Sequence, residues 1–548
     1  MEFDFVIVGA GSAGCVLANR LSADGRYSVA VLEAGGKDTY PWIHVPVGYF
    51  KTMGNPRTDW CYETAPDPGL NGRSLKWPRG RVLGGSSSIN GLLYVRGQAQ
   101  DYDHWRQLGN VGWSWQDVLP LFMRSESYSG GDGAVRGRDG PLTVSDSAVH
   151  REVIDRWIDA GVAAGYPKNA DYNGTDQEGV AHFQLTMRNG RRCSSAVAYL
   201  NPAKTRSNLT VLTNCAARRL VFDGSRVSGI AVTHKGKKTV IQARKEVVLS
   251  AGALASPQLL MVSGIGEPKE LQDHGITVRY ASPGVGKNLQ DHLQARPVYK
   301  TTLSTINTEI NNFIKQGLIA LHYAATRKGP MTMAASLGTA FLKTRPELET
   351  PDIQFHLQPF SADQKINKPH DFNAFTASVL QLRPESAGHL ELQSANMEDH
   401  PIIHPNYLAT KTDQDTIVEG IRIARKICRH SPVAEVITEE YNPGPQLSDD
   451  DYDGILNWAR DTATTIYHPT GTCKMGSDPM SVVDERLRVH GVQGLRVADA
   501  SIMPVIVSGN TNAPCIMIGE KASDMILQDA ITGGGSIAAQ QELQAKAS

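Results

Sequence analysis

The sequence predicts a mixed α/β protein of two domains, one of which is built on a parallel sheet. The first observation is the order of strand, glycine turn, helix, strand and acid over residues 1–33. The second is a buried-type strand at 246–250, far along the chain, which makes the parallel-sheet domain discontinuous in sequence. The third is a block over 293–465 in which alternating strands, such as 353–357 and 377–382, occur together with amphipathic helices. Such a block predicts a second sheet covered by helices.

The N-terminal glycine turn predicts dinucleotide binding. An apolar strand over 3–8 leads directly into Gly9-Ala10-Gly11-Ser12-Ala13-Gly14, and a helix follows over 15–21. In such a turn the first glycine allows the tight bend, the second lets a pyrophosphate approach the helix N-terminus, and the third allows close helix–strand contact. A second strand over 28–32 ends at Glu33, where an acid that holds ribose hydroxyls is expected. A carboxylate there disfavours a 2′-phosphate, so the motif predicts FAD or NAD without choosing between them.

Composition excludes several classes of protein. The 548 residues carry a net charge of −1, with 41% hydrophobic and 20% charged residues, as in ordinary globular proteins. We expect no nucleic-acid partner, because this balance creates no strong field. No run reaches the ~18–20 apolar residues of a membrane-spanning helix, and the N-terminus lacks the basic segment of a signal peptide. Seven scattered cysteines without a Cys-x-x-Cys pair indicate reduced thiols and no metal site. We expect a cytoplasmic protein, with peripheral contact at the inner membrane as an alternative.

Two stretches after the turn are predicted to form functional loops, the first a lid or a wrap around the cofactor and the second a cofactor loop. Residues 36–78 are rich in proline and aromatic residues, which is typical of a long functional loop. The run Gly84-Gly85-Ser86-Ser87-Ser88 offers a bare backbone with hydroxyl donors, which suits a phosphate or the polar edge of a ring. We interpret it as a cofactor loop and not a linker, because an apolar, helix-like run follows over 92–95.

The remaining elements are predicted from periodicity. Strands over 208–213, 218–222, 227–233 and 239–243 predict an antiparallel meander, after which the strand 246–250 leads to a helix over 258–263 that begins at Pro257. Further helices are predicted over 152–164, 308–325, 413–430 and 449–463, and another through Glu520 and Met525.

Taken in order, these motifs resemble the glucose–methanol–choline family of flavin oxidoreductases over nearly all of the chain. The resemblance rests on the N-terminal turn with Glu33, on 80–103, on 252–266, on 284–292, and on His468 with Gly471, Thr472 and Met475. It implies FAD as the cofactor. It also implies a Rossmann-like FAD-binding domain with a β-meander and a substrate domain with a large antiparallel sheet. We expect the FAD-binding domain over 1–150, 200–292 and 466–532, the substrate domain over 151–199 and 293–465, and a flexible tail over 533–548.

The resemblance assigns the catalytic roles to His468 and Asn510. A neutral histidine takes the hydroxyl proton of an alcohol near neutral pH, so His468 is the expected base. The family's second catalytic position holds His or Asn and matches Asn510, whose amide donates to the alkoxide oxygen but cannot act as a base. Asn512 is the nearby alternative. We expect Asp291 and His292 to fix a loop, and the histidines outside the motifs to pack or lie at the surface; these are His44, His104, His182 and His356.

The resemblance also implies the cofactor contacts. Asn90 and its neighbours are expected along the flavin. Choline oxidases carry a covalently bonded histidine at the position of Ile89, so the flavin is expected to be non-covalent here. Asp499 and Ala500 match a contact near the pyrophosphate and ribityl chain, with a helix-cap role for Asp499 as the alternative. The predicted cofactor-binding residues are Gly9, Gly11, Ser12, Ala13, Gly14, Glu33, Ala34, Arg81, Gly84, Gly85, Ser86, Asn90, Gly91, Leu92, Ala216, Ala251, Asp499, Ala500, Asn510 and Thr511.

The implied reaction is FAD-dependent oxidation of a primary alcohol to an aldehyde, by proton abstraction and hydride transfer to flavin N5. Electrons are expected to pass to a quinone or another acceptor, as in bacterial alcohol and choline dehydrogenases. An oxygen-using alcohol oxidase, a redox-silent hydroxynitrile lyase and a photodecarboxylase stay open as alternatives. Choline would require an aromatic cage and a carboxylate, so we expect a medium-chain aliphatic or aromatic primary alcohol.

Overall fold

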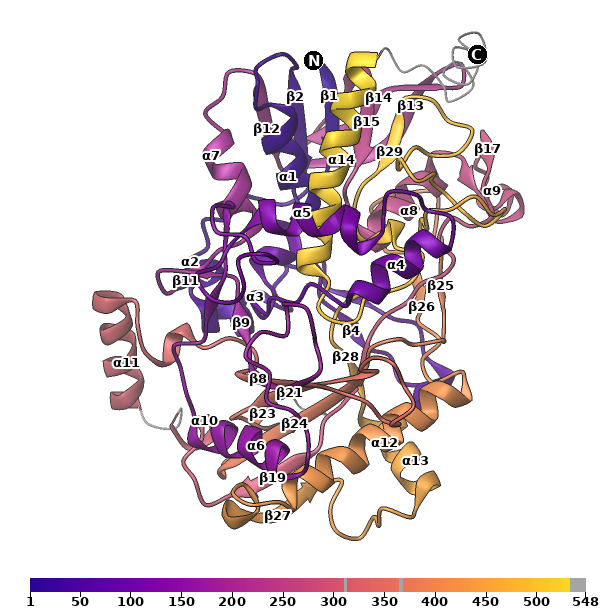
Figure 1. The fold of residues 1–548 in the computed structure, drawn as a ribbon. Coiled ribbons are helices and arrows are strands. Elements are labelled where there is room, and N and C mark those ends of the chain that lie inside the picture. Colours follow the sequence, from indigo (N-terminus) through magenta and orange to yellow (C-terminus); the bar gives the residue numbers. More distant parts are fainter. Residues whose placement is uncertain (310–312, 364–367, 533–548) are drawn as a thin grey trace, which may run out of the picture.

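The computed structural model describes residues 1–309, 313–363 and 368–532. The tail predicted over 533–548 therefore lies outside the described residues. Two large sheets organise the described chain, one of seven strands and one of eight. In Figure 1 the N-terminal strands β1 and β2 lie at one end of the molecule, and the helices α6, α12 and α13 lie at the other.

The seven-stranded sheet combines a parallel core with an antiparallel extension. Its central strand, β15, pairs in parallel with β1 and, near its C-terminal end, with β29; its N-terminal half pairs with the antiparallel strand β14. The strands are β1 (Glu2–Val8), β2 (Val29–Glu33), β12 (Leu209–Thr213), β13 (Cys215–Asp223), β14 (Arg226–His234), β15 (Lys237–Leu249) and β29 (Leu495–Val497).

This sheet corrects the predicted meander in two places. The strand over 208–213 was expected in the antiparallel meander, but β12 pairs in parallel with β2, with Leu209 opposite Val29. The two strands predicted over 239–243 and 246–250 form one continuous strand, β15. The polar residues between the two predicted strands are exposed or half-buried in β15. In the sequence they interrupt the apolar pattern, so the strand was predicted to end there. Periodicity identifies a strand but does not identify its neighbours.

Helices α1 (Ser12–Leu21), α8 (Gly252–Val262) and α14 (Asn512–Thr532) pack with the seven-stranded sheet. The prediction that a helix begins at Pro257 was wrong, since α8 begins five residues earlier and contains the proline. Pro257 has no N–H to donate to the carbonyl of Ala253. The Thr472 hydroxyl donates to that carbonyl at 2.6 Å instead, so a distant segment satisfies the acceptor that the proline leaves free.

The eight-stranded sheet is antiparallel and is covered on one face by α6 (Glu152–Ala163), α12 (Lys411–Cys428) and α13 (Tyr452–Thr462) (Figure 1). Ile353, Phe355 and Leu357 of β21 belong to the core on that side. Because side chains alternate along a strand, the residues between them face the opposite side. The strands are β8 (Gly179–His182), β18 (Leu293–Ala295), β19 (Val298–Thr301), β20 (Gly338–Leu342), β21 (Ile353–Gln358), β24 (Ala374–Gln381), β27 (Ile437–Asn442) and β28 (Thr464–Thr465).

Short elements complete the description. The helix predicted over 308–325 is observed as α10 (Ile306–Glu309) and α11 (Phe313–Thr326), and residues 310–312 lie outside the described part. Helix α11 projects from the body of the molecule in Figure 1. The remaining elements include α2 (Pro41–His44), α3 (Tyr49–Thr52), α4 (Ala99–Gln107), α5 (Trp115–Ser125), α9 (Pro268–Asp273), and the hairpin of β25 (His389–Glu391) and β26 (Ile402–His404).

The run 92–95 is not helical, so the helix-like continuation predicted there was wrong. Leu92 has a φ of 66°, which takes it out of any right-handed helix, and Leu93 forms a bridge with Leu185.

The two cores cut across the predicted domain boundaries. Tyr62, Leu70 and Trp77 of the loop over 36–78 pack in the core of the eight-stranded sheet. Ala198 and Tyr199, predicted in the substrate domain, pack in the core of the seven-stranded sheet. The division at residues 150 and 199 therefore stays a prediction.

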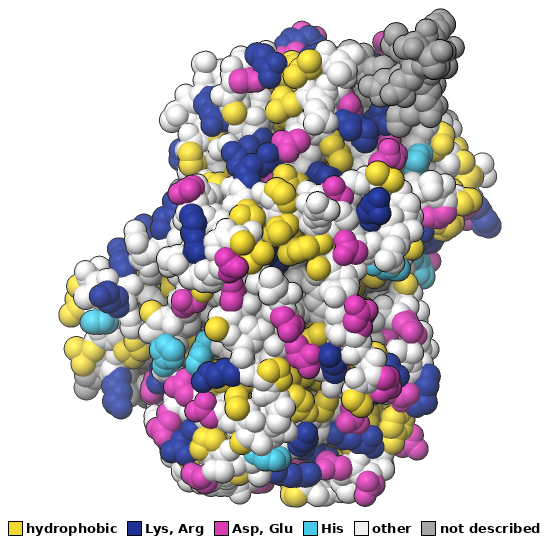
Figure 2. All heavy atoms as spheres, in the orientation of Figure 1, with side chains coloured by type: hydrophobic (Ala, Val, Ile, Leu, Met, Phe, Trp, Pro, Cys, Tyr) yellow, Lys and Arg dark blue, Asp and Glu magenta, His cyan; other side chains and the backbone are white. Residues whose placement is uncertain are grey.

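The surface carries charges of both signs. Figure 2 shows Lys and Arg interspersed with Asp and Glu over the face that it draws, in keeping with a net charge of −1. In the described part of the chain, we find no helix with the length and apolarity that a membrane span requires. All seven cysteines are free thiols.

Candidate active site

A cavity of about 1290 Å³ reaches from the glycine turn after β1 to the face of the eight-stranded sheet that its helices leave uncovered. Residues of both sheets line it, together with the N-termini of α1 and α14 and the loop over 36–78. A space of this size exceeds what most small-molecule ligands need, and its walls hold most of the predicted site residues.

The three glycines of the turn are needed for different reasons. A Cβ at Gly9 would lie 2.4 Å from the Ser250 carbonyl oxygen, and one at Gly14 would lie 1.9 Å from the Gly9 carbonyl oxygen. A Cβ at Gly11 would meet nothing nearer than 3.7 Å. Packing therefore requires the first and third glycines, whereas Gly11 borders open cavity at the N-terminus of α1. That bare helix end is where a pyrophosphate is bound in dinucleotide folds, so the turn fits the predicted cofactor.

Glu33 lies at the same end of the cavity and is 5% exposed. Its carboxylate accepts hydrogen bonds from the backbone N–H groups of Ala10, at 3.0 Å, and Gly35, at 2.8 Å. Burial raises the pKa of this carboxyl to about 7, against the opposing effect of the two backbone donors. The acid is thus held rigidly beside the turn, where the sequence predicts ribose binding.

Most predicted cofactor residues line this cavity. They are Gly9, Gly11, Ser12, Ala13, Glu33, Ala34, Arg81, Gly85, Ser86, Asn90, Gly91, Ala216, Ala251, Asp499, Ala500, Asn510 and Thr511. Three predicted residues do not line it. Gly14 allows the close packing of α1. Gly84 has a φ of 90°, and a Cβ there would clash with the Ser88 hydroxyl. The side chain of Leu92 is fully buried in a separate core, and its carbonyl accepts from Thr186.

Asp499 shows the cap geometry that was its alternative reading. Its carboxylate accepts from the N–H and hydroxyl of Ser501, from the Gly252 N–H and from the Ser256 hydroxyl. It therefore ties a short 3₁₀ helix to the start of α8 while lining the cavity. With four donors engaged, the carboxylate has little capacity left for a cofactor.

Arg192 holds the Asn90 side chain and backbone in place. The sequence did not identify it as a site residue. Its guanidinium donates to the Asn90 side-chain oxygen at 2.6 Å and to the Asn90 carbonyl at 2.7 Å. Burial without a carboxylate partner lowers the pKa of Arg192 to about 9. The two residues are 102 positions apart, and the sequence carries no signal that pairs them.

His468 is held by a chain of hydrogen bonds that ends at a backbone carbonyl. His292 Nε2 lies 2.9 Å from the Leu382 carbonyl oxygen, and His292 Nδ1 lies 3.0 Å from His468 Nδ1. Burial lowers the pKa of His292 to about 4, and burial together with the neighbouring histidines lowers the pKa of His468 well below its usual value. Both rings are therefore neutral at pH 7.

Neutrality fixes both tautomers, because a neutral imidazole has one donor and one acceptor nitrogen. The Leu382 carbonyl only accepts, so His292 carries its proton on Nε2 and accepts at Nδ1. His468 must then donate from Nδ1, which leaves the lone pair on Nε2. The site thus presents an unprotonated nitrogen, the form that a general base requires.

Asn510 and not Asn512 faces that nitrogen. The Asn510 amide donates to His468 Nε2 at 3.2 Å, and its oxygen lies 3.5 Å from the Gln354 amide. Asn512 instead accepts from the Ser12 hydroxyl at 2.9 Å, at the N-terminus of α1. The geometry favours the first of the two predicted assignments.

Asp291 supports the segment that carries His468. Its carboxylate accepts from the His468 N–H at 2.6 Å, from the Thr465 hydroxyl at 2.5 Å and from the Tyr407 hydroxyl. Tyr467, just before the histidine, has a φ of 71°. Asp291 therefore fixes a strained loop, in agreement with its expected role.

The wall opposite the glycine turn is polar and incompletely hydrogen-bonded. Gln294 and Arg296 lie on and just after β18, and Gln354, His356 and Gln358 alternate along β21. In the described structure no protein group bonds Gln294 Oε1, Arg296 Nε, Gln354 Oε1 or His356 Nε2. His356 had been expected to pack or lie at the surface, but it lies on the cavity wall. Alternation along β21 was the available signal, and it required knowing which face the helices cover.

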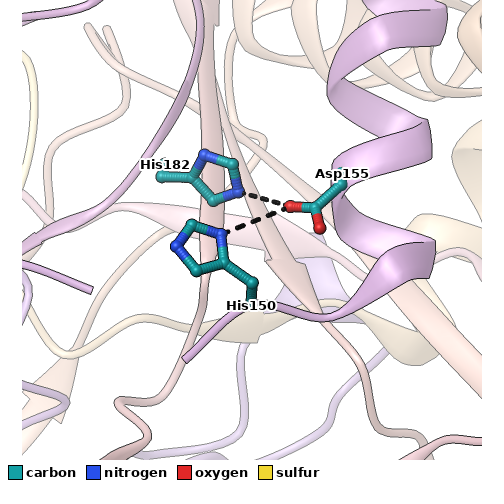
Figure 3. A group of neighbouring side chains, drawn as sticks. All are labelled: His150, Asp155 and His182. Carbon is teal, nitrogen blue, oxygen red and sulfur yellow. Dashed lines mark hydrogen bonds and ion pairs between the residues drawn. The ribbon is translucent and has the colours of Figure 1, made fainter. Parts of the chain in front are cut away.

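Two further histidine groups lie away from the cavity lining. Figure 3 shows His150, Asp155 and His182, with His182 Nε2 2.8 Å from the Asp155 carboxylate and His150 Nδ1 3.6 Å from it. His389, Glu391 and His404 form a similar group on the β25–β26 hairpin. Each group could hold a metal ion by its spacing, but its members already contact one another and are at least partly exposed. Neither group takes part in the site described above.

The chain is similar to known proteins over nearly its whole length. Sequence models described as GMC oxidoreductase match residues 3–294 and 384–519. An alcohol dehydrogenase (acceptor) of Pseudomonas putida and an oxygen-dependent choline dehydrogenase of Brucella anthropi are each 42% identical over 530 residues, or 96% of both chains. The crystal structure of pyridoxine 4-oxidase from Mesorbium loti is 31% identical, with a TM-score of 0.87, over 95% of this chain and 98% of the other.

Proposed function

The chain belongs to the GMC oxidoreductase family, and from this premise we propose that it oxidises a primary alcohol to an aldehyde with His468 as the base and a non-covalent flavin. It is an FAD-dependent oxidoreductase that acts on CH–OH donors. The further assignments concern the residues, the kind of alcohol and the acceptor. The site geometry supports the residue assignments.

The observation that carries the proposal is the unprotonated Nε2 of His468, which the His292–Leu382 chain orients toward Asn510. An alcohol hydroxyl that replaces the Asn510 amide as the hydrogen-bond partner of Nε2 gives its proton to that nitrogen. The Asn510 amide then donates to the developing alkoxide oxygen, where charge accumulates. As the carbinol carbon loses a hydride, the C–O bond becomes the aldehyde carbonyl.

FAD, when bound, supplies the acceptor for that hydride. Glu33 would hold the ribose hydroxyls, and the bare backbone around Gly11 would hold the pyrophosphate. Gly85, Ser86 and Asn90 would lie along the flavin. Ile89 lines the cavity and has no nucleophilic atom, which supports a non-covalent flavin.

We further propose a quinone or another non-oxygen acceptor and a cytoplasmic location. The Pseudomonas putida relative is named for an unspecified acceptor and the Brucella anthropi relative for oxygen, so an oxidase is the alternative. Leu318 and Leu321 on the projecting helix α11 are 62% and 67% exposed. Such a surface supports a hydrophobic acceptor or peripheral membrane contact. Seven free thiols support a reducing compartment.

Anaerobic mixing of the holoenzyme with primary alcohols tests the reaction. We expect the flavin absorbance to bleach, and His468→Ala to slow the bleaching by about 10²–10⁴-fold, as removal of a general base does. His104→Ala, which changes an exposed histidine on α4, is the matched control. Absence of bleaching across a broad alcohol panel would remove the proposed substrate class, and full activity of His468→Ala would remove the proposed base.

Two further assays address the acceptor and the flavin linkage. Turnover measured with oxygen alone and then with an artificial acceptor separates oxidase from dehydrogenase. Acid precipitation should release the flavin into the supernatant. Yellow colour that stays with the pellet would contradict the non-covalent assignment.

A further inference from the structure

Arg296 is an unusual residue in the wall of the cavity. It follows β18 directly, is half-buried and lines the cavity opposite the glycine turn. Its guanidinium makes one hydrogen bond to a side chain, to Gln358 Oε1 at 2.9 Å, and its Nε has no partner among the described residues. No carboxylate of the described chain lies within ion-pair distance of it.

The other arginines that line the cavity are better compensated. Arg151 pairs with Glu309 at 2.7 Å, and Arg218 pairs with Glu398. Arg79 donates to the carbonyls of Pro78 and Tyr467, and the charge of Asp291 acts on it. Arg81 lies over the ring of Trp60, 4.8 Å from its centroid.

The side chains around Arg296 bring no negative charge. Gln294 and Gln358 are amides, and His356 is neutral because burial lowers its pKa to about 3. The carboxylates that line the cavity are engaged elsewhere. Glu33 lies at the glycine turn, Asp499 caps a helix, and Glu309 and Glu398 pair with arginines. The sheet end of the cavity therefore has a net positive charge.

A half-buried cation without a counter-ion is electrostatically costly, and an anion brought beside it gains more than it would in water. The guanidinium remains charged even where burial lowers its pKa, and its planar fork matches a carboxylate. Tyr49 and Tyr467 are the ionisable side chains that act on Arg296, and both are neutral phenols at pH 7 because burial raises their pKa.

The strand β21 connects Arg296 to the catalytic pair. Gln354 lies 3.5 Å from Asn510, and Gln358 bonds Arg296, with His356 between them. Four residues of a strand span roughly 13 Å. Arg296 therefore lies farther along the wall than the reacting hydroxyl and not in contact with it, at a spacing that a medium-sized substrate can bridge.

We propose that Arg296 binds a carboxylate on the substrate, so that the preferred substrate is a primary alcohol whose other end carries a carboxylate. This inference rests on the proposed alcohol oxidation and specifies its substrate class. The same charge disfavours a quaternary ammonium alcohol, which would need a carboxylate in place of Arg296.

The test compares alcohols that differ only in the carboxylate. The holoenzyme is assayed with ω-hydroxyoctanoate and with octanol, as the native protein, as Arg296→Gln and as Arg296→Lys. We expect kcat/KM of the native enzyme to be higher for ω-hydroxyoctanoate. Arg296→Gln should lower that value by about 10- to 100-fold, mainly through KM, which is the range for loss of a charged hydrogen bond. The loss for octanol should be much smaller, and Arg296→Lys should retain part of the preference.

Arg106→Gln is the control for a change of net charge, since Arg106 is exposed on α4 and does not line the cavity. It should leave the preference for ω-hydroxyoctanoate as it is in the native enzyme. A native enzyme that prefers octanol, or an equal preference in the native and Arg296→Gln enzymes, would overturn the inference.

Binding of an unreactive anion separates this inference from the proposed reaction. Octanoate titrated into the holoenzyme should bind saturably by calorimetry, and Arg296→Gln should weaken that binding by about 10- to 100-fold. If neither alcohol bleaches the native flavin while octanoate still binds through Arg296, the proposed reaction fails and the anion site stands. If alcohols bleach the flavin but octanoate binds both proteins equally, the reaction stands and the anion site fails.

Discussion

His292 Nδ1 and His468 Nδ1 lie 3.0 Å apart, and this contact decides which nitrogen of His468 is free to act as a base. The Leu382 carbonyl fixes the proton of His292 on Nε2, at 2.9 Å. His292 therefore accepts from His468, whose Nε2 lone pair is left facing Asn510. A backbone carbonyl thus orients the base through an intervening ring, without a carboxylate that would raise the pKa of His468.

Replacing His292 should test this orientation. His292→Leu removes the acceptor for His468 Nδ1–H, and we expect flavin reduction to slow by about 10- to 100-fold, the usual effect of losing an orienting partner. His292→Gln, whose amide offers both an acceptor and a donor, should recover part of the rate. Stopped-flow reduction by a saturating alcohol measures both.

The pH profile distinguishes a positioning role from simple loss of folding. In the native enzyme the pKa of His468 is well below 6.5, so the reduction rate should stay level from pH 8 to below 6.5 and fall only as His468 becomes protonated. His292→Leu should shift this decline along the pH axis. An unshifted profile with a uniformly lower rate would speak against control of the base by His292.

Asn510 and Asn512 should differ in what their loss affects. Asn510→Ala removes the donor at 3.2 Å from His468 Nε2, and we expect flavin reduction to slow by about 10²–10³-fold, as with other oxyanion donors. Asn512→Ala breaks a contact with Ser12 at the N-terminus of α1, so its effect should appear in FAD affinity. Stopped-flow reduction and FAD titration of the apoprotein measure the two effects. A larger rate loss in Asn512→Ala would reverse the assignment.

The sequence predicts what depends on local order and misses what depends on contacts between distant segments. The glycine turn, Glu33 and the two strands on either side of α1, β1 and β2, follow from spacing along the chain. His292 and His468 are 176 residues apart, so their contact could not be inferred from either motif. Asn510 and Asn512 belong to one motif, and what separates them is that α14 begins at Asn512 and turns its side chain toward Ser12.

The polar wall shows the same limit. Alternation along β21 separates Ile353, Phe355 and Leu357 from Gln354, His356 and Gln358, but alternation does not say which face meets helices and which meets a ligand. The pairing of β18 and β21 with β24 places Ala295 level with Phe355. Arg296 reaches Gln358 from there through its side chain, a contact that depends on this distant pairing. Pro257 was taken as a helix start because the sequence does not reveal the distant Thr472 hydroxyl that satisfies Ala253.

FAD affinity should depend on pH through Glu33. Burial raises the pKa of this carboxyl to about 7, so in the apoprotein it is largely protonated below pH 7 and ionised above. Both oxygens of the ionised form accept hydrogen bonds from ribose hydroxyls. We expect the Kd of FAD to be level above pH 7 and to rise by up to about tenfold for each unit below it. Fluorescence titration of the apoprotein measures this dependence.

The stability of the apoprotein should change in the opposite direction. A carboxyl whose pKa rises from 4.5 in the unfolded chain to about 7 in the folded one binds more protons when folded. Its contribution to stability is therefore lost as pH rises from about 4.5 to 7. Glu33→Gln should remove both trends, and an FAD titration with the same slope in Glu33→Gln would assign the pH dependence to another group.

Gly11 and Gly14 should separate cofactor binding from folding. A Cβ at Gly14 would lie 1.9 Å from the Gly9 carbonyl oxygen, so Gly14→Ala should destabilise the apoprotein by about 1–3 kcal/mol or more, as overpacking does. A Cβ at Gly11 has 3.7 Å of clearance and the residue has a φ of −78°, which alanine adopts without strain. Gly11→Ala should therefore fold with nearly native stability.

Gly11→Ala, the more stable of the two variants, should bind FAD more weakly than its stability suggests. In Gly11→Ala the added methyl group projects into the space that the pyrophosphate needs at the N-terminus of α1, so we expect a clear loss of FAD affinity in a protein that is still stable. Thermal unfolding of the apoproteins and FAD titration give the two rankings independently. Native affinity in Gly11→Ala would show that the pyrophosphate does not pack against this glycine, and would move the predicted phosphate contact to the Gly85–Ser86 loop beside it.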